Sequence, residues 1–316
     1  MKDLRIIFMG TPEFAVESLK KLVENHYHVV AVVTMPDKPV GRHHDTLQAS
    51  PVKEYAVGQG IPVLQPERLK DEAFLEELRS YHADLQVVVA FRMLPEVVWA
   101  MPPKGTFNLH AALLPQYRGA APINWAVING DTETGVTTFF LDHDIDTGGI
   151  IHRVSAPIAD SDTVGDVYDR LMNLGADLVL KTVDDIEAGT VRPVPQPNIK
   201  DLRPAPKLFK ENTEIRWSEH TVKSAYDFIR GLSPYPGAWT TLRTADGKET
   251  QLKVFLAKKG EGNLCVPLSD GNLGLTDIQL AGKRRMSVSD FLRGAHLEGA
   301  VLVENEKKLT KSLVVS

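Results

Sequence analysis

The residues most able to do chemistry lie together in the segment from Thr106 to Asn124. Within this segment Asn108 and His110 are two positions apart, so in an extended strand their side chains point to the same face. An amide and an imidazole side by side can polarise a carbonyl oxygen and move a proton. This pair therefore predicts a site for chemistry at a carbonyl group.

An acidic run follows further along the chain, directly after residues 137–141, which we expect to form a strand. It contains Asp142, Asp144 and Asp146 and leads into two glycines. A carboxylate brought near His110 would hold the orientation of the imidazole ring and stabilise its charged form.

Spacing alone leaves other interpretations of these residues open. A histidine near a strand end is often a structural hydrogen-bonding group. The acidic run resembles a calcium loop, but the EF-hand pattern needs glycine and glutamate at the positions of Thr147 and Arg153. No histidine pair has the helical i, i+4 spacing of a zinc site, and spacing alone leaves the chemistry of these residues unresolved.

The elements that must position these residues alternate between strand and helix signals. Largely apolar strands separated by helices indicate a Rossmann-like α/β domain, with a parallel sheet covered on both faces. Active sites in such sheets lie at the carboxyl ends of the strands. Pro62 places the third strand at an edge, and residues 35–51 form a loop with three prolines and a glycine. The expected strands are residues 4–9, 28–34, 61–64 and 85–90, and the expected helices are residues 13–23 and 70–80.

The first strand ends at Gly10, where a dinucleotide-binding protein would carry the pattern G-x-G-x-x-G. The turn reads Gly10-Thr11-Pro12-Glu13-Phe14, without the second and third glycines. A dehydrogenase is therefore the weakest alternative for the function. Gly10 is also open to interpretation as a residue that permits a tight turn.

The character of the sequence changes between residues 191 and 206, where prolines and a lack of periodicity indicate a semi-rigid linker. Beyond it, a helix at residues 222–230 and short strands with turns at 245–248 and 269–272 favour a small β-barrel. We therefore expect a catalytic domain over residues 1–190, a linker over 191–206 and an OB-like barrel domain over 207–316.

Length and composition suit a globular protein of two domains. Of the 316 residues 43% are apolar and 24% charged, and no apolar run approaches the roughly 20 residues of a membrane helix, so we expect no membrane contact. The single cysteine, Cys265, excludes an intrachain disulfide, and no signal peptide precedes Gly10, so we expect a cytoplasmic protein. The net charge is −5, but residues 207–316 carry 17 Lys and Arg against 13 Asp and Glu. Any contact with a polyanion is therefore expected in the C-terminal part.

Three sequence elements, in the right order and at the right separations, resemble the active-site signature of the folate-dependent formyltransferases. They are Asn108-Leu109-His110, then Leu113-Leu114-Pro115 with Arg118-Gly119, and Asp146-Thr147-Gly148. The resemblance extends over nearly the whole chain and is closest to the members that act on methionyl-tRNA. Further similar segments are residues 8–14, 50–53, 232–239, 282–284 and 290–292.

The resemblance implies an activity and its catalytic residues. The protein would transfer the formyl group of 10-formyltetrahydrofolate to the free amino group of initiator methionyl-tRNA, giving N-formylmethionyl-tRNA for translation initiation. Asn108, His110 and Asp146 would be the catalytic trio. Because the folate already activates the formyl group, neither a metal nor a covalent enzyme intermediate is required. We also expect the protein to be a monomer.

The resemblance also implies which residues bind the two substrates. The folate pocket would be lined by Ala112, Leu113, Leu114 and Pro115. Arg42, in the long loop, would contact the tRNA acceptor end. We expect further tRNA contacts from a basic cluster in the barrel domain, namely Lys283, Arg284 and Arg285.

The chain departs from the family pattern at three places. Ala112 stands where serine is usual, and Arg92 stands where a small residue is common. After Arg42 the chain continues with His43-His44-Asp45 instead of lysines, which weakens the attraction of the loop for phosphates.

The main alternative is a formyltransferase that acts on a UDP-amino-sugar, because such enzymes share the catalytic signature. The proline-rich loop with Arg42 and the segment 232–239 favour tRNA instead. A glycinamide ribonucleotide formyltransferase would end near the linker. A tRNA-binding protein without activity is disfavoured by the presence of all three catalytic residues.

Overall fold

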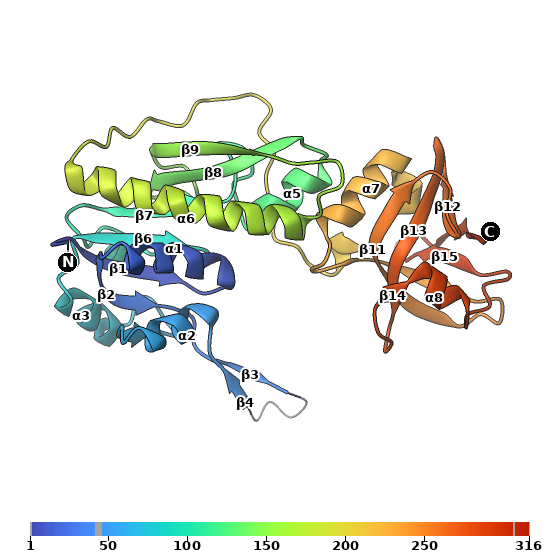
Figure 1. The fold of residues 1–316 in the computed structure, drawn as a ribbon, viewed down its shortest axis with the longest axis horizontal. Coiled ribbons are helices and arrows are strands. Elements are labelled where there is room, and N and C mark those ends of the chain that lie inside the picture. Colours follow the sequence, from blue (N-terminus) through green and yellow to red (C-terminus); the bar gives the residue numbers. More distant parts are fainter. Residues whose placement is uncertain (1, 42–45, 306, 316) are drawn as a thin grey trace. The chain divides into compact units, whose positions relative to one another are not determined.

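The computed structural model describes residues 2–41, 46–305 and 307–315, and the chain divides into two compact units (Figure 1). The first unit comprises residues 1–119, 134–157 and 168–204. The second comprises residues 120–133, 158–167 and 205–316.

The first unit is built around a sheet of seven strands: β1 Arg5–Gly10, β2 His28–Val33, β5 Val63–Leu64, β6 Leu85–Val89, β7 Thr106–His110, β8 Glu133–Phe140 and β9 Ile150–Pro157. Their order is β5-β2-β1-β6-β7-β8-β9, which places β5 at an edge as predicted. The strands from β5 to β7 pair in parallel, whereas β8 runs antiparallel to β7. The parallel part follows from apolar strands that are buried on both faces.

Helices cover the two faces of this sheet: α1 Glu13–Glu24, α2 Pro51–Gly58, α3 Glu72–Ser80, α4 Glu96–Trp99 and most of α6 Val164–Ala188. On one face, Phe74 of α3 and Val98 of α4 pack in a cluster with Val88 of β6. On the other face, α6 approaches β7 closely, because a Cβ added at Gly175 would lie 2.7 Å from the Leu109 side chain. The glycine therefore sets the distance between α6 and β7.

Gly10 has a structural role at the end of β1. A Cβ at this position would lie 2.7 Å from both the Val89 carbonyl oxygen and the Ala15 Cβ. The absence of a side chain thus lets β1, β6 and the start of α1 meet closely. This close approach explains why position 10 is a glycine, and a dinucleotide-binding role is not needed to explain it.

Residues 35–51, predicted to be a loop, contain a short antiparallel hairpin that projects from the unit (Figure 1). Its strands are β3 Lys38–Val40 and β4 Thr46–Gln48. The prediction was wrong here because the strands have three residues each and one contains Pro39, which suits only an edge position. Arg42, His43, His44 and Asp45 lie outside the described residues.

The second unit is an antiparallel, nearly closed barrel with three short helices: α5 Pro122–Ile128, α7 Val222–Gly231 and α8 Val288–Leu292. Its strand order is β16-β15-β10-β11-β13-β12-β17, with β14 paired to β13. The strands are β10 Ala238–Arg243, β11 Glu249–Lys259, β12 Leu264–Leu268, β13 Gly271–Leu280, β14 Met286–Ser287, β15 Val301–Glu304, β16 Leu309–Ser312 and β17 Val314–Val315.

The barrel is filled by apolar side chains around Trp217, which is 1% exposed and donates its indole N–H to Thr240 Oγ1 at 3.1 Å. The turns predicted at 245–248 and 269–272 join β10 to β11 and β12 to β13. The α/β first unit and the OB-like barrel confirm the predicted fold class, whereas the exact domain boundaries stay a prediction. Among the described residues, no helix has both the length and the apolar character that a membrane span requires.

We expect Phe107→Ala to lower the free energy of unfolding by about 3–5 kcal/mol, because Phe107 is fully buried in β7 and truncation leaves a cavity. Urea denaturation followed by far-UV circular dichroism measures the loss. Leu47→Ala, at a position that is 68% exposed, is the control and should change stability by no more than about 0.5 kcal/mol. A loss below about 1 kcal/mol for Phe107→Ala would contradict this description of the core.

Candidate active site

Strand β7 presents Asn108 and His110 on one face at its carboxyl end, as the i, i+2 spacing predicts. In the sheet, Asn108 pairs with Val88 of β6 and His110 pairs with Thr137 of β8. Leu109 points to the opposite face and packs against α6. The strand register therefore fixes both polar side chains at the edge where active sites of parallel sheets lie.

The His110 ring is buried, at 6% exposure, between two hydrogen-bond acceptors. Its Nε2 lies 2.7 Å from the Tyr117 carbonyl oxygen, and its Nδ1 lies 3.8 Å from Asp146 Oδ2. A carbonyl oxygen can only accept, so Nε2 carries a proton in this arrangement. The second nitrogen is the one that faces the carboxylate.

Of the three acidic residues in the run, Asp146 is the one that faces His110. It is 9% exposed, whereas Asp142 and Asp144 are exposed. Its carboxylate accepts a hydrogen bond from the Gly119 N–H at 3.0 Å on Oδ2. This bond fixes the oxygen that lies opposite the imidazole.

The loop that carries Asp146 is strained and tightly packed. Asp146 has a φ of 56°, in the left-handed region that non-glycine residues rarely adopt. Its carbonyl oxygen accepts hydrogen bonds from Arg118 Nε at 3.2 Å and from Gln196 Nε2 at 2.7 Å. Strained residues of this kind persist only where surrounding contacts hold them, and they gather at functional sites.

Asn108 carries an unsatisfied polar atom beside this pair. Its Oδ1 is buried and has no hydrogen-bond partner among the described residues. Buried polar atoms are nearly always paired, so this oxygen is an available hydrogen-bond acceptor on the face of β7 that also carries His110. The oxygen and nitrogen of an amide can exchange places, so the group can either accept or donate.

The stretch from Ala112 to Pro115, predicted to line the folate pocket, forms a turn directly after β7. Thr137 Oγ1 donates to the Ala112 carbonyl at 2.6 Å and accepts from the Leu114 N–H at 3.1 Å. Arg153 of β9 donates to the Leu114 carbonyl at 2.9 Å. These bonds fix the backbone of the turn.

The sequence motifs do not reveal Thr137, Arg153 or Gln196 as residues of the site. Thr137 and Arg153 act on backbone atoms, which a residue motif does not reveal. Gln196 lies in the proline-rich segment, whose composition suggested only a connection. The one available signal was a polar residue flanked by Pro195 and Pro197.

The base of the β3–β4 hairpin is held by polar contacts. Lys53 Nζ and Gln65 Nε2 both donate to Asp37, at 2.7 Å to Oδ2 and 2.7 Å to Oδ1, respectively. These hydrogen bonds, that of Lys53 first, hold the pKa of Asp37 below its ordinary value. Thr34 Oγ1 lies 2.7 Å from Ser50 Oγ across the two chain segments that enter the hairpin. The hairpin therefore begins from a fixed base.

Arg92, one of the departures from the family pattern, ties the end of β6 to the segment after β5. Its guanidinium donates to the carbonyl oxygens of Glu67 at 2.8 Å and of Pro66. Burial lowers its pKa from the ordinary value. The arginine thus links the segment after β6 to the segment after β5 through backbone carbonyl oxygens.

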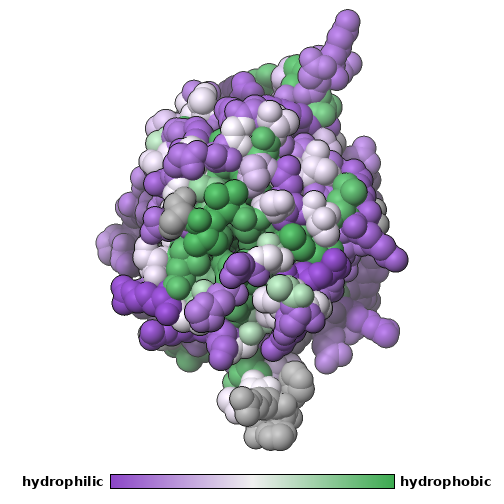
Figure 2. Space-filling view, turned by 90° about the vertical axis from the view of Figure 1, so that its right-hand side faces the viewer, coloured by the Kyte–Doolittle hydropathy of each residue, from purple (hydrophilic) through white to green (hydrophobic). Residues whose placement is uncertain are grey.

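In the second unit, Lys283 and Arg284 are exposed on the turn between β13 and β14. Arg285 is engaged, because it donates to Asp277 Oδ1 at 2.5 Å and its guanidinium carbon lies 4.4 Å from the centroid of the Phe255 ring. Figure 2 shows apolar side chains gathered on one face of this unit, among hydrophilic ones. An apolar patch of this kind does not attract phosphates.

The carboxylate of Asp142 is engaged within the acidic run itself. Asp142 Oδ1 accepts from Thr147 Oγ1 at 2.9 Å and from the Asp144 N–H at 3.2 Å, so it closes its own turn. Among the described residues, no three His, Cys, Asp or Glu side chains gather as metal ligands would.

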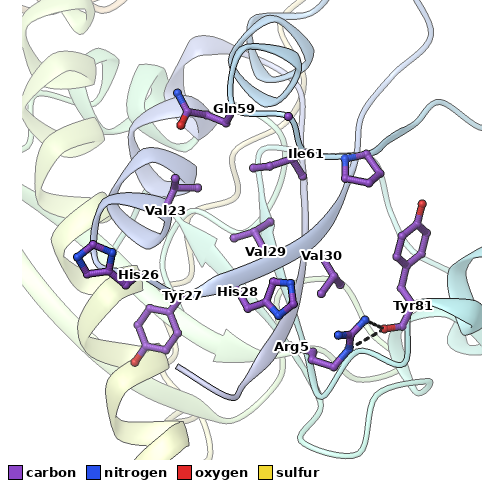
Figure 3. A pocket seen from close by; sticks show the side chains of 12 residues that line it. Arg5, Val23, His26, Tyr27, His28, Val29, Val30, Gln59, Ile61 and Tyr81 are labelled. Carbon is purple, nitrogen blue, oxygen red and sulfur yellow. Dashed lines mark hydrogen bonds between the residues drawn. The ribbon is translucent and has the colours of Figure 1, made fainter. Parts of the chain in front are cut away.

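A cavity of about 660 Å³ lies at the opposite, amino edge of the sheet, beside Arg5 and His28 at the starts of β1 and β2 (Figure 3). The Arg5 guanidinium donates to the Tyr81 carbonyl oxygen at 2.9 and 2.7 Å. Two N–H groups of Arg5 are therefore already engaged by the protein. We assign no chemistry to this cavity.

Comparison with known proteins identifies the family. Residues 4–183 match the formyl transferase family and residues 207–296 match the formyl transferase C-terminal domain. The chain belongs to the formyltransferase family. A member from Parabacteroides distasonis, called methionyl-tRNA formyltransferase, is 60% identical over 93% of this chain and 96% of its own length.

Solved structures of formyltransferase-like proteins share the fold at low identity. HypX from Aquifex aeolicus, solved with tetrahydrofolic acid, is 17% identical over 92% of this chain, with a TM-score of 0.64. This chain spans 47% of the length of HypX. The sugar 3N-formyl transferase WlaRD, solved with dTDP and 5-N-formyl-THF, is 18% identical, covers 90% of this chain and all of its own, and has a TM-score of 0.61.

We expect Gly148→Ala to abolish most of the activity that depends on Asp146. A Cβ at Gly148 would lie 1.6 Å from the Phe140 carbonyl oxygen, so the loop carrying Asp146 must shift. Steady-state formyl transfer measures the loss. Gly58→Ala, where an added Cβ meets no atom within 4 Å, is the control; equal activity of the two variants would show that the loop tolerates displacement.

Proposed function

We propose that this protein transfers the formyl group of 10-formyltetrahydrofolate to the α-amino group of initiator methionyl-tRNA, which yields N-formylmethionyl-tRNA for translation initiation. The observation that carries the proposal is the similarity to a methionyl-tRNA formyltransferase from Parabacteroides distasonis. The two sequences are 60% identical over 93% of this chain and 96% of the relative. Asn108, His110 and Asp146 gathered at the carboxyl edge of the sheet support the same chemistry. A cytoplasmic location and a monomeric state belong to this proposal.

The reaction is an acyl transfer in which the free amine attacks the formyl carbon and the bond from that carbon to N10 of the folate breaks. The tetrahedral intermediate carries an oxyanion, and the attacking nitrogen carries a proton that must leave. N10 must gain a proton as its bond breaks. The site therefore has to supply hydrogen-bond donors to an oxygen and an acceptor for one proton.

His110 and Asn108 are suited to hold the oxyanion. Because Nε2–H is engaged by the Tyr117 carbonyl, the proton on Nδ1 of the imidazolium is the one that can reach a reacting oxygen. The Asn108 amide, two positions earlier on the same face, supplies a second donor through its NH₂ group. Donors fixed in a buried site stabilise developing charge without first reorganising.

Asp146 is suited to accept the proton of the attacking amine. The gap of 3.8 Å between Asp146 Oδ2 and His110 Nδ1 is too long for a direct hydrogen bond. One atom placed beside this gap can lie within hydrogen-bonding distance of both groups. The carboxylate and the imidazole can thus act on the same reacting centre, and the imidazole can return a proton to N10.

The folate would lie against the turn from Ala112 to Pro115. Alanine at position 112 removes no backbone contact, because Thr137 holds the Ala112 carbonyl. The unpaired Oδ1 of Asn108 supports this placement, because it can accept a hydrogen bond from a donor group of the bound folate. When bound, the folate supplies the activated formyl group.

Contacts with the tRNA would come from Arg42 and from the basic cluster Lys283, Arg284 and Arg285. The hydrogen bonds to Asp37 and the contact between Thr34 and Ser50 support a role for the hairpin, since they fix its base. As part of the same proposal, residues 1–190 carry out catalysis, residues 191–206 form a linker and residues 207–316 bind the tRNA.

The acceptor assay compares two substrates. Labelled 10-formyltetrahydrofolate is incubated with charged initiator methionyl-tRNA or with a UDP-amino-sugar. The proposal expects label on the tRNA alone. Label on the sugar alone would preserve the formyl-transfer chemistry but overturn the assigned acceptor.

We expect His110→Ala and Asp146→Asn each to lower kcat about 100- to 1,000-fold, the usual effect of removing one fixed oxyanion donor or proton acceptor. Folate affinity, measured by equilibrium dialysis, should stay within about twofold, because both groups act on the reacting centre. A variant with kcat near that of the wild type would remove that residue from the catalytic trio.

Arg42→Ala and the double change Lys283→Gln with Arg284→Gln should weaken tRNA binding and flatten its salt dependence. The slope of log affinity against log salt should fall by about one for each phosphate contact removed. The control changes Lys70 and Lys104 to glutamine, which removes the same charge from exposed positions of the first unit. Equal slopes in the double variant and the control would show that Lys283 and Arg284 do not meet phosphates.

A further inference from the structure

The side chain of Gln196 reaches the Asp146 loop from the proline-rich segment. Its Nε2 donates to the Asp146 carbonyl at 2.7 Å and to the Gly148 carbonyl at 3.0 Å. Its Oε1 accepts from Arg118 Nη2 at 2.7 Å and Nε at 3.3 Å. Both halves of the amide are therefore in use, the donor half on the loop and the acceptor half on Arg118.

Gln196 is half-buried although its sequence neighbours are exposed. Pro193, Val194, Pro195 and Pro197 all face solvent. An inward-pointing polar side chain in an exposed segment indicates that the segment is placed by what this side chain contacts. Burying an amide is favourable only where its donors and acceptor are satisfied, as they are here.

The backbone of the same segment is fixed directly beside this contact. Val194 and Ile150 exchange two hydrogen bonds, at 2.8 Å from the Ile150 N–H and 2.9 Å from the Val194 N–H. Pro197 restricts Gln196 to an extended backbone, because a residue before proline avoids the helical region. The amide is therefore held in place before any substrate binds.

Gln196 donates to the carbonyl oxygens of Asp146 and Gly148, which belong to the turn that orients the Asp146 carboxylate. Asp146 has a left-handed backbone, and its side chain lies between the Gly119 N–H and His110 Nδ1. If the loop relaxes to an ordinary backbone conformation, the carboxylate leaves this position. Arg118, from the turn after the folate-lining stretch, shares the Asp146 carbonyl and thus links the loop to that turn.

We propose that Gln196 is a positioning residue for formyl transfer, which holds the strained Asp146 loop so that the carboxylate faces His110. The proline-rich segment is then part of the active site as well as a connection in the chain. This inference rests on the proposed function, in which Asp146 accepts the proton of the attacking amine.

The test compares Gln196→Met and Gln196→Glu in two backgrounds, the wild type and Asp146→Asn. Methionine keeps the length of the side chain and removes all four hydrogen bonds. Glutamate keeps the contact with Arg118 but turns an oxygen toward the two carbonyls, so it isolates the donor half and serves if the methionine variant does not fold. Formyl transfer to methionyl-tRNA gives kcat and the KM of each substrate.

In the wild-type background we expect kcat to fall about 10- to 100-fold in both variants, with each KM within about twofold. In the Asp146→Asn background the same changes should alter kcat by less than about twofold, because a residue that acts through the carboxylate has nothing left to position. A merely structural role would lower activity further in both backgrounds.

Arg192→Ala is the control within the same segment. Arg192 is exposed and donates to the carbonyl oxygens of Gly189 and Val191, and we expect kcat to be unchanged. Equal losses in both backgrounds, or a wild-type kcat for both Gln196 variants, would overturn the inference while Asp146→Asn remains impaired. Failure of the wild-type protein to formylate methionyl-tRNA would instead overturn the proposed function.

Discussion

The site depends on one buried imidazole held between a backbone carbonyl and a carboxylate. The Nε2–H of His110 donates a hydrogen bond to the Tyr117 carbonyl oxygen at 2.7 Å, and its Nδ1 lies 3.8 Å from Asp146 Oδ2. Burying a group that can carry charge is costly unless its polar atoms are paired or complemented. The fold must therefore fix the positions of the Tyr117 carbonyl and the Asp146 carboxylate beside the ring.

The fold places these neighbours by fixing two turns through their backbone. The turn after β7 is held by Thr137 and Arg153, and the Asp146 loop is held by Arg118 and Gln196. Each of these four side chains donates to a carbonyl oxygen. The sheet supplies the remaining constraint, since β7 brings His110 to the carboxyl edge where both turns begin or end.

Much of this arrangement could be predicted because it follows from local periodicity. Apolar runs and helical patterns gave the strands and helices of the first unit, and the i, i+2 spacing placed Asn108 beside His110. The role of Gln196 could not be predicted, because it depends on contacts between segments far apart in the sequence. The hairpin at 35–51 was missed because its strands have only three residues each and one of them contains Pro39.

The chemistry and the choice of acceptor rest on different parts of the chain. In the proposed function, formyl transfer depends on Asn108, His110 and Asp146 and on the two fixed turns. In the same proposal, the choice of acceptor depends on the β3–β4 hairpin and on the exposed cations of the barrel. The 60% identity to a methionyl-tRNA formyltransferase extends over both parts, which supports one substrate for the whole chain.

The central claim is that His110 and Asp146 act as one unit on the reacting centre, and a double-mutant cycle tests it most directly. The rate of formyl transfer is measured for His110→Ala, for Asp146→Asn and for the protein with both changes. Residues that act as a unit are strongly non-additive, so we predict that the double variant is within about tenfold of the slower single variant. Losses that multiply would show that the two residues work independently, and would contradict the account.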